Sequence, residues 1–250
     1  MHRRLAEFLT TVLIFCATAA ALALHSGSFG LSWDALNHHI YLGFIADSPR
    51  WHLDVAAASS QTYQYPYLYW PFYRLTLMGL SGAKAAALWA VFQTLCVVPA
   101  VWLASLRLLG GERDDWESRL HRFIACLLAF VSILVMAAVG GSANDLLAAT
   151  PLLWAIVLAL SPAATFQRVA LCSFLVGLAV AFKVSNLVCL PLFLFALLDL
   201  PIRRIWIIRV AVAAVASVAG FTVAYAPWGW QLWKQFGNPI YPYFDTFFRS

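Results

Sequence analysis

Apolar segments long enough to cross a membrane constrain this chain more than any other feature of its sequence. Apolar residues make up 63% of the chain and charged residues only 11%, whereas a soluble domain carries about 45–50% and about 25%. About twenty apolar residues suffice to cross a bilayer as a helix. The segments that we assign to spans are Leu5–Leu24, Lys84–Leu106, Phe123–Val139, Asp145–Leu160, Val169–Lys183, Leu187–Leu200 and Val210–Ala226.

Several of these segments are shorter than an ideal span. A helix of about 17 residues covers about 25 Å of a hydrocarbon core that is about 30 Å thick. We therefore expect the short segments to lie inside a bundle or to extend beyond their apolar windows. The sequence contains no internal repeat, so residues 1–250 are expected to form one domain. It predicts an all-α fold, a polytopic transmembrane helix bundle of about seven spans.

The first segment follows Met1-His2-Arg3-Arg4 and in this respect resembles a secretory signal peptide. It is nevertheless long enough to span a bilayer, and further apolar segments follow it. We therefore expect an uncleaved first helix.

The positions of the basic residues predict which side of the membrane each connection occupies. Connections that carry an excess of Lys and Arg lie in the cytoplasm. One set of connections contains Arg3, Arg4, Arg107, Arg113, Arg119, Arg122, Arg168, Arg203, Arg204 and Arg209. We therefore expect a multi-pass protein of the bacterial inner membrane with a cytoplasmic N-terminus. The loop of residues 25–83 and the aromatic tail of residues 228–250, expected to be a loop rather than a further span, would then be periplasmic.

Charge and cysteine usage argue against other classes of protein. The net charge is +5, but no clustered basic face lies outside the connections, so nucleic acid is not an expected partner. The five cysteines lie inside apolar segments, at spacings that match no metal motif. We expect them to be small apolar residues packed among helices.

The loop of residues 25–83 holds a dense group of ionisable side chains. Ser32 is a favourable N-cap for a helix that we expect from Asp34 to about Ile45. With an α-helical period, His39 faces away from Asp34. The polar stripe of this amphipathic surface helix consists of Asp34, Asn37, His38 and Tyr41. We expect the stripe to face a cavity, although a merely solvated face is the alternative.

Two further interpretations of this loop stay open. Asp34 and His38, four residues apart, could hold a divalent metal together with His52 and Asp54, although this spacing is not specific to metal sites. Aromatic residues recur at alternate positions from Gln61 to Pro71 and predict an extended segment. That segment would form either an interfacial aromatic belt or a platform for a sugar or an isoprenoid chain.

Three more polar residues are expected on the same side of the membrane. Asn144 and Asp145 lie between the third and fourth predicted spans, where Asp145 could simply cap the fourth helix. Lys183 ends the fifth span and is a lone cation on the side that lacks basic residues. We expect it to bind a phosphate; the alternative is that it snorkels to the interface.

Together these features resemble the GT-C superfamily of integral-membrane glycosyltransferases, whose shared module has seven spans. Three segments are similar to bacterial members close to glycosyltransferase family 87 and to uncharacterised relatives: Trp33–Tyr41, Gln61–Tyr63 and Gly237–Phe244. Asp34 stands alone where such enzymes carry neighbouring carboxylates. Members usually continue with further spans, so the chain resembles the seven-span module of a longer enzyme.

The resemblance implies that a sugar moves from a polyprenyl-phosphate donor to a hydroxyl acceptor, with Asp34 as the general base. A cation or a divalent metal would stabilise the phosphate leaving group. The first candidate for this role is Lys183, followed by Arg50, Arg74 and Lys234. The residues expected to contact the substrates are His38, His39, Tyr41, Gln61, Tyr63, Asn144, Asp145, Lys183 and Asn238.

A membrane transporter and a non-catalytic membrane subunit are the alternative functions. A transporter would carry charged or broken segments near the middle of the bilayer. In this chain the ionisable residues gather at the ends of apolar segments, which favours chemistry at the membrane interface.

Overall fold

Helices account for nearly all of the secondary structure. The computed structural model of the chain describes residues 2–27, 32–109, 115–161, 165–190 and 204–249. Its helices are α1 (His2–Ser26), α2 (Ile40–Asp47), α3 (Trp70–Thr76), α4 (Gly82–Leu108), α5 (Trp116–Phe130), α6 (Ile133–Ala138), α7 (Asp145–Ala159), α8 (Phe166–Phe182), α10 (Arg204–Phe236) and α11 (Asp245–Phe248). The shorter elements are η1 (Ala35–His39), β1 (Ala57–Ser60), η2 (Gln61–Tyr63) and η3 (Val184–Cys189).

The predicted all-α class is confirmed for the described part of the chain, in which β1 has only four residues. The helices α1, α4 and α10 are long and apolar enough to cross a membrane, and α7 and α8 are shorter apolar helices. This is the pattern of a helical membrane protein. The number of spans and the single-domain organisation stay predictions.

Five of the predicted spans coincide with the helices α1, α4, α7, α8 and α10. The third differs, because α5 ends at Phe130 and α6 begins only at Ile133. Ser132 lies at this break, where its hydroxyl accepts a hydrogen bond from the Val135 N–H and thereby starts a new helix. The sixth predicted span begins in η3, and its continuation from residue 191 lies outside the described residues.

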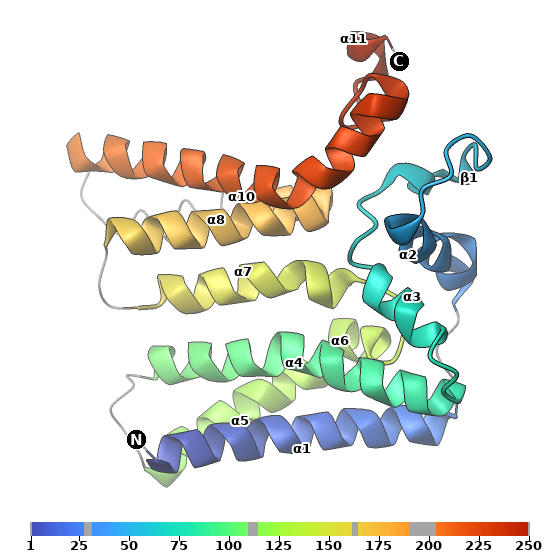
Figure 1. Cartoon of the computed structure of the whole chain (residues 1–250). Coiled ribbons are helices and arrows are strands. Elements are labelled where there is room, and N and C mark those ends of the chain that lie inside the picture. Colours follow the sequence, from blue (N-terminus) through green and yellow to red (C-terminus); the bar gives the residue numbers. More distant parts are fainter. Residues whose placement is uncertain (1, 28–31, 110–114, 162–164, 191–203, 250) are drawn as a thin grey trace.

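The prediction that all of residues 228–250 form a loop is wrong for residues 228–236, because α10 continues to Phe236. Trp228 and Leu232 are fully buried in this last part of the helix, and their burial stabilises its extension. The ribbon of α10 bends in its C-terminal part (Figure 1), which contains Pro227. Gly237 follows the last residue of the helix, and its positive φ of 68° is typical of a helix C-terminus.

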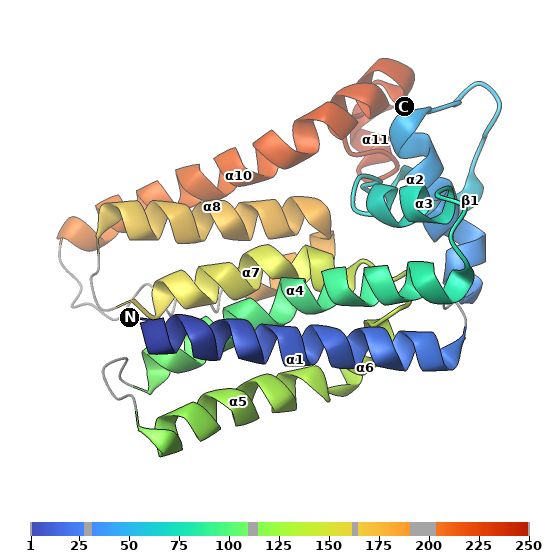
Figure 2. The same ribbon diagram turned by 60° about the horizontal axis from the view of Figure 1, so that its bottom comes forward.

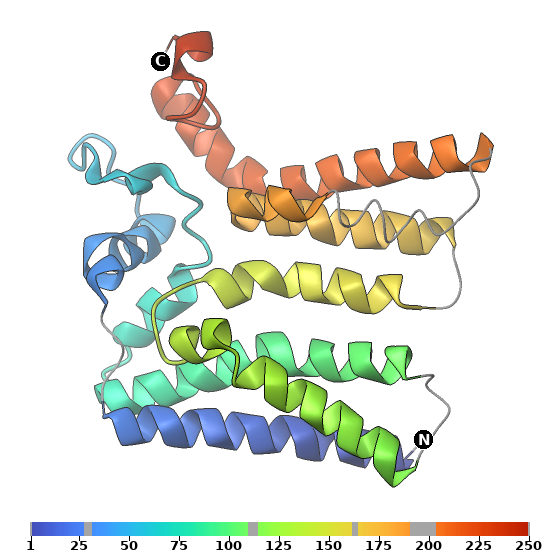
Figure 3. The ribbon, with the colours of Figure 1, turned by 180° about the vertical axis from the view of Figure 1, so that it is seen from behind.

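The helices α1, α4, α5, α7 and α8 run in alternating directions, and α10 runs in the same direction as α8, so the connections gather at the two ends of the bundle (Figures 1 and 2). The loop that joins α1 to α4 is called the first loop here. Together with the α6–α7 connection, the end of α8 and the tail after α10, it lies at one end of the bundle (Figure 3). The N-terminal end of α1 lies at the other end. This arrangement gathers most of the predicted site residues.

Small residues set the close packing of α8 against α10. A Cβ atom added to Gly177 would overlap the carbonyl oxygen of Ser217, and one added to Gly220 would overlap that of Phe174. Only glycine allows two helix backbones to approach this closely. The pairing fixes the C-terminal end of α8, and with it Lys183, beside the C-terminal part of α10.

Candidate functional site

The first loop begins with a π-helical turn, η1, in which the Ile40 N–H donates to the Ala35 carbonyl oxygen five residues earlier. Residues five positions apart lie closer to the same side in such a wide turn than in an α-helix, and π turns are frequent at functional sites. Asp34 and His39 are five positions apart, and both line one cavity. The prediction that His39 faces away from Asp34 is therefore wrong, because it assumed an α-helical period.

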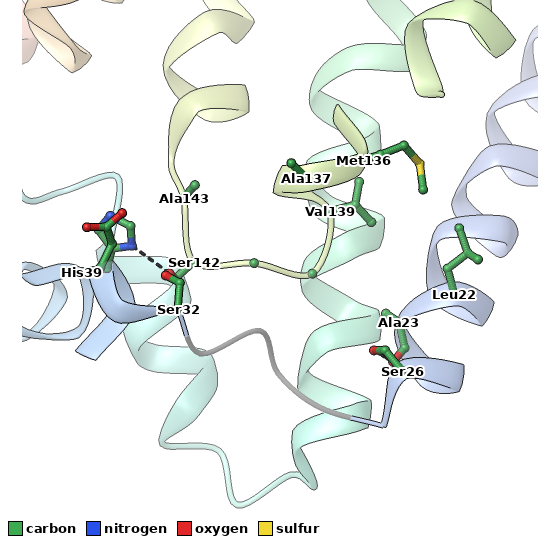
Figure 4. A pocket seen from close by; sticks show the side chains of 13 residues that line it. Leu22, Ala23, Ser26, Ser32, His39, Met136, Ala137, Val139, Ser142 and Ala143 are labelled. Atoms are coloured by element: carbon green, nitrogen blue, oxygen red, sulfur yellow. Dashed lines mark hydrogen bonds between the residues drawn. The ribbon is translucent and has the colours of Figure 1, made fainter. Parts of the chain in front are cut away.

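His39 is buried, with 7% of its surface exposed. Its Nδ1 is hydrogen-bonded to the Ser142 Oγ at 2.7 Å (Figure 4), and its ring stacks on Tyr69 at a centroid distance of 4.7 Å. Burial, and to a smaller extent the neighbouring His38, lowers the pKa of His39 to about 4. The imidazole of His39 is thus neutral at physiological pH.

The backbone of Tyr69 can approach α2 because Gly43 of that helix carries no side chain. A Cβ atom at Gly43 would lie 2.8 Å from the Tyr69 carbonyl oxygen, closer than two such atoms can come without strain. Gly43 therefore helps to place Tyr69 against His39.

His38 is also buried, and its edge lies against the ring of His39 at a centroid distance of 4.2 Å. Its Nδ1 is 3.9 Å from the Asp34 Oδ1 and has no hydrogen-bond partner. Burial lowers the pKa of His38, and the carboxylate of Asp34 opposes this shift. The side chain of Asp34 itself is 55% exposed. Asp34 thus provides an accessible carboxylate beside two buried imidazoles, of which only His38 belongs to the expected polar stripe.

The α6–α7 connection, which carries Ser142, is held by two side chains from α4. The Gln93 Oε1 accepts a hydrogen bond from the Gly140 N–H at 2.9 Å, and its Nε2 donates to the Gly141 carbonyl at 3.2 Å. Trp89 donates to the same carbonyl at 2.8 Å. Neither Gln93 nor Ser142 was predicted as a site residue, although a glutamine inside an apolar helix indicates a polar partner.

Asp34 and His39 line a cavity of about 720 Å³, which we call the first cavity (Figure 4). Its walls come from the C-terminal end of α1, from η1, from α6 and from the α6–α7 connection. Ser142 and Ala143 lie beside His39, and Leu22 and Met136 lie farther away. The cavity thus has a polar side and an apolar side.

The ammonium group of Lys183, which is expected to bind a phosphate, pairs with the Asp145 carboxylate. Asp145 is the first residue of α7, and Lys183 follows the last residue of α8. The side chain of Lys183 is 38% exposed and that of Asp145 is 60% exposed. Such accessible ion pairs contribute only about 0–1 kcal/mol to stability. An anionic ligand could therefore compete with Asp145 for Lys183.

Lys183 lines a different cavity, of about 220 Å³, which we call the second cavity. Asn144 and a group of aromatic side chains also line it, namely Tyr63, Tyr65, Tyr69, Phe182, Tyr225 and Tyr243. Burial raises the pKa of Tyr65 to about 12 and also raises that of Tyr63. These two phenols are therefore neutral at physiological pH and can donate hydrogen bonds.

Asp34 and Lys183 thus line separate cavities, and one pair of stacked rings lies between them. His39 belongs to the first cavity and Tyr69 to the second. The predicted residues His39, Tyr63, Asn144 and Lys183 all line one of the two.

Five predicted residues lie outside both linings, namely His38 and Asp145, described above, and Tyr41, Gln61 and Asn238. Tyr41 packs against an apolar cluster with Leu42. Gln61 has a buried side-chain oxygen without a hydrogen-bond partner. Asn238 accepts a hydrogen bond from the Ile240 N–H and donates to the Tyr243 carbonyl, so it shapes the turn that carries Tyr243.

The alternative phosphate-binding cations have other surroundings. Arg50 forms an ion pair with Asp54, and Arg74 forms one with Asp47. Lys234 is exposed on α10. In the described part of the chain no group of three or more His, Cys, Asp or Glu side chains is placed to hold a metal ion.

The aromatic segment from Gln61 to Pro71 is not continuously extended, because η2 opens it and α3 begins at Trp70. Its side chains hold the first loop against α10: the Trp228 Nε1 donates to the Tyr63 carbonyl at 3.1 Å, and Gln231 donates to the Tyr67 hydroxyl. Most of these rings therefore pack inside the protein, and a few of them also line the second cavity.

The arrangement combines an accessible carboxylate, neutral imidazole and phenol groups, and a cation whose partner is exposed. Such a set can accept a proton from a hydroxyl group and can hold an anion nearby. Comparisons of the chain with protein-family models, with curated proteins and with solved structures find no match.

Proposed function

We propose that the chain is an integral-membrane glycosyltransferase, which moves a sugar from a polyprenyl-phosphate donor to a hydroxyl acceptor. The observation that carries the proposal is the pair of adjoining cavities. One contains the accessible carboxylate of Asp34 and the other contains Lys183 among aromatic rings, and His39 of the first lining stacks on Tyr69 of the second.

The second cavity suits the donor. The ammonium group of Lys183 can pair with a phosphate oxygen, because its present partner, Asp145, is well exposed to solvent. The neutral phenols of Tyr63 and Tyr65 can donate hydrogen bonds to the phosphate or the sugar, and their faces can pack on a sugar ring or an isoprenoid chain.

The first cavity then receives the acceptor. The acceptor oxygen attacks the anomeric carbon of the donor, and the bond from that carbon to the phosphate oxygen breaks. The electron pair of this bond goes to the polyprenyl phosphate, and the hydroxyl proton goes to the Asp34 carboxylate. A single displacement inverts the anomeric configuration. General base catalysis of this kind contributes about 10²–10⁴-fold.

The proposal includes a topology of about seven spans, with the site on the periplasmic face of a bacterial inner membrane. The alternating directions of α1, α4, α5, α7 and α8 support it. Arg107, Arg119 and Arg168 are close to the ends of α4, α5 and α8 that lie opposite the site. An excess of arginine marks the cytoplasmic side.

The test is to incubate the purified chain, reconstituted in lipid nanodiscs, with a panel of radiolabelled polyprenyl-phosphate sugars and mixed acceptors. Release of polyprenyl phosphate supports the enzyme. Solute flux in vesicles without release would instead support a transporter, and neither activity would support a non-catalytic subunit.

The variant Lys183→Met tests the donor site separately. We expect it to raise the donor KM by about tenfold or more, because a hydrogen bond to a charged group contributes about 1.5–3 kcal/mol. Lys234→Met, at an exposed position on α10, is the matched control. An unchanged donor KM in Lys183→Met would remove Lys183 from the site.

A further inference from the structure

We propose that the first cavity takes an acceptor whose hydroxyl group is carried on a membrane lipid, rather than on a soluble sugar or a protein. This inference rests on the proposed function and names the class of its second substrate.

The walls of the first cavity are divided into two sides. The polar side is made of Ser32, Asp34, His39 and Ser142, whereas Ser26 lies beside Ala23 on α1 (Figure 4). The apolar side is made of Leu22, Ala23, Met136, Ala137 and Val139. A ligand that satisfies both sides has a hydroxyl-bearing head next to an apolar body. A soluble sugar would leave the apolar side without a partner.

The apolar side is continuous with a surface that needs an apolar environment. Leu22 and Ala23 belong to α1, a helix long and apolar enough to cross a membrane. On α6, Ile133 is 82% exposed and Leu134 is 77% exposed. Met136 lies on the same helix, lines the cavity and is itself 41% exposed. A lipid could therefore reach the cavity from the bilayer without passing through water.

The charge of the cavity distinguishes this ligand from the donor. None of the described residues that line it is Lys or Arg, and its ionisable groups are Asp34 and His39. Burial lowers the pKa of His39 to about 4, so the imidazole adds no positive charge at physiological pH. A phosphate close to Asp34 would be repelled, whereas a neutral hydroxyl group can donate its proton to the carboxylate.

The size of the cavity also limits the acceptor. Its volume of about 720 Å³ lies within the range of about 300–1,000 Å³ that is usual for small-molecule sites. It has room for a sugar ring and the first part of an alkyl chain, but not for a folded polypeptide.

The experiment compares two acceptors with the same sugar head, a methyl glycoside and a dodecyl glycoside. The full chain is reconstituted in nanodiscs and supplied with the radiolabelled donor that it turns over. We expect kcat/KM to be at least about tenfold higher for the dodecyl glycoside, because burial of only two methylene groups supplies that factor. Equal values for the two acceptors would overturn the inference.

A long alkyl chain also concentrates an acceptor in the bilayer, so a variant must separate this effect from binding. Ala137→Phe fills the apolar side at an exposed position, where a larger side chain can be accommodated. It should remove the preference for the dodecyl glycoside and leave the donor KM unchanged. Leu134→Phe, on the same helix but outside the lining, should keep the preference.

Three outcomes have distinct meanings. A preference that survives in Ala137→Phe, and also in a second variant, Met136→Gln, would reflect partitioning alone and would contradict the lipid acceptor site. Absence of donor turnover with every acceptor would contradict the proposed function itself, whereas turnover without chain-length dependence would contradict only the acceptor class.

Discussion

Replacing Gln93 by leucine should loosen the connection that carries Ser142 to His39. Gln93 is fully buried in α4 and makes hydrogen bonds with both Gly140 and Gly141. The leucine side chain has a similar size but neither donates nor accepts. The Gly141 carbonyl keeps its bond from Trp89, so the main loss is the bond from the Gly140 N–H.

A buried N–H group left without a partner costs about 1–3 kcal/mol. The contact from the Gln93 Nε2 to the Ala143 carbonyl, at 3.5 Å, is too long to add much. We therefore expect Gln93→Leu to lower the free energy of unfolding by about 2 kcal/mol. For a chain of this size the corresponding fall in the unfolding temperature is about 4–8 °C.

The assay is thermal unfolding of the purified protein, with Thr94→Val as the matched control. Thr94 is the next residue in α4 and is equally buried, but its hydroxyl donates only to the Ala90 carbonyl of its own helix. That carbonyl remains part of the helical hydrogen-bond ladder. If Gln93→Leu unfolds no earlier than Thr94→Val, Gln93 does not hold the connection in the way that we describe.

Two further predictions concern the opposite end of the bundle and the pH dependence. Glu7→Gln should lower the free energy of unfolding by about 3–5 kcal/mol. Arg122 is 1% exposed and forms two hydrogen bonds to Glu7, so the variant would leave its charge buried without a carboxylate. Glu117→Gln, at an exposed position on α5, is the control, and equal shifts in unfolding temperature for the two variants would contradict the argument. Burial lowers the pKa of His39 to about 4, below about 6.5 in the unfolded chain, so only the unfolded chain takes up a proton between these values. Stability should therefore fall as the pH drops from 6.5 towards 4, by up to about 3 kcal/mol. In His39→Gln, thermal unfolding at pH 7 and pH 5 should show a smaller difference, and an unchanged difference would contradict the assignment.

The helical class and the positions of most long helices could be predicted because long apolar runs leave few other structures in a membrane. The break at Ser132 could not, since one serine in an apolar run is compatible with a continuous helix. The extension of α10 past Pro227 was also missed, because Trp228 and Leu232 look like interfacial residues until the first loop is seen to bury them.

The site could be predicted only in part. The sequence placed Asp34 and His38 correctly at the start of a helix, but nothing in it indicates the π turn that brings His39 to the side of Asp34. The partner of Lys183 could have been found from topology alone. α7 begins and α8 ends at the same end of the bundle, which brings Asp145 within reach of Lys183.

The most direct test of the account is the rate of sugar transfer by Asp34→Asn. Asparagine keeps the shape of the side chain but is too weak a base to take the acceptor proton, so the account predicts a loss of about 10²–10⁴-fold in kcat with the donor KM and the unfolding temperature unchanged. Asp47→Asn, in the same loop but outside both cavities, is the control and should transfer normally. Normal transfer by Asp34→Asn would contradict the central claim that the carboxylate in the first cavity is the general base.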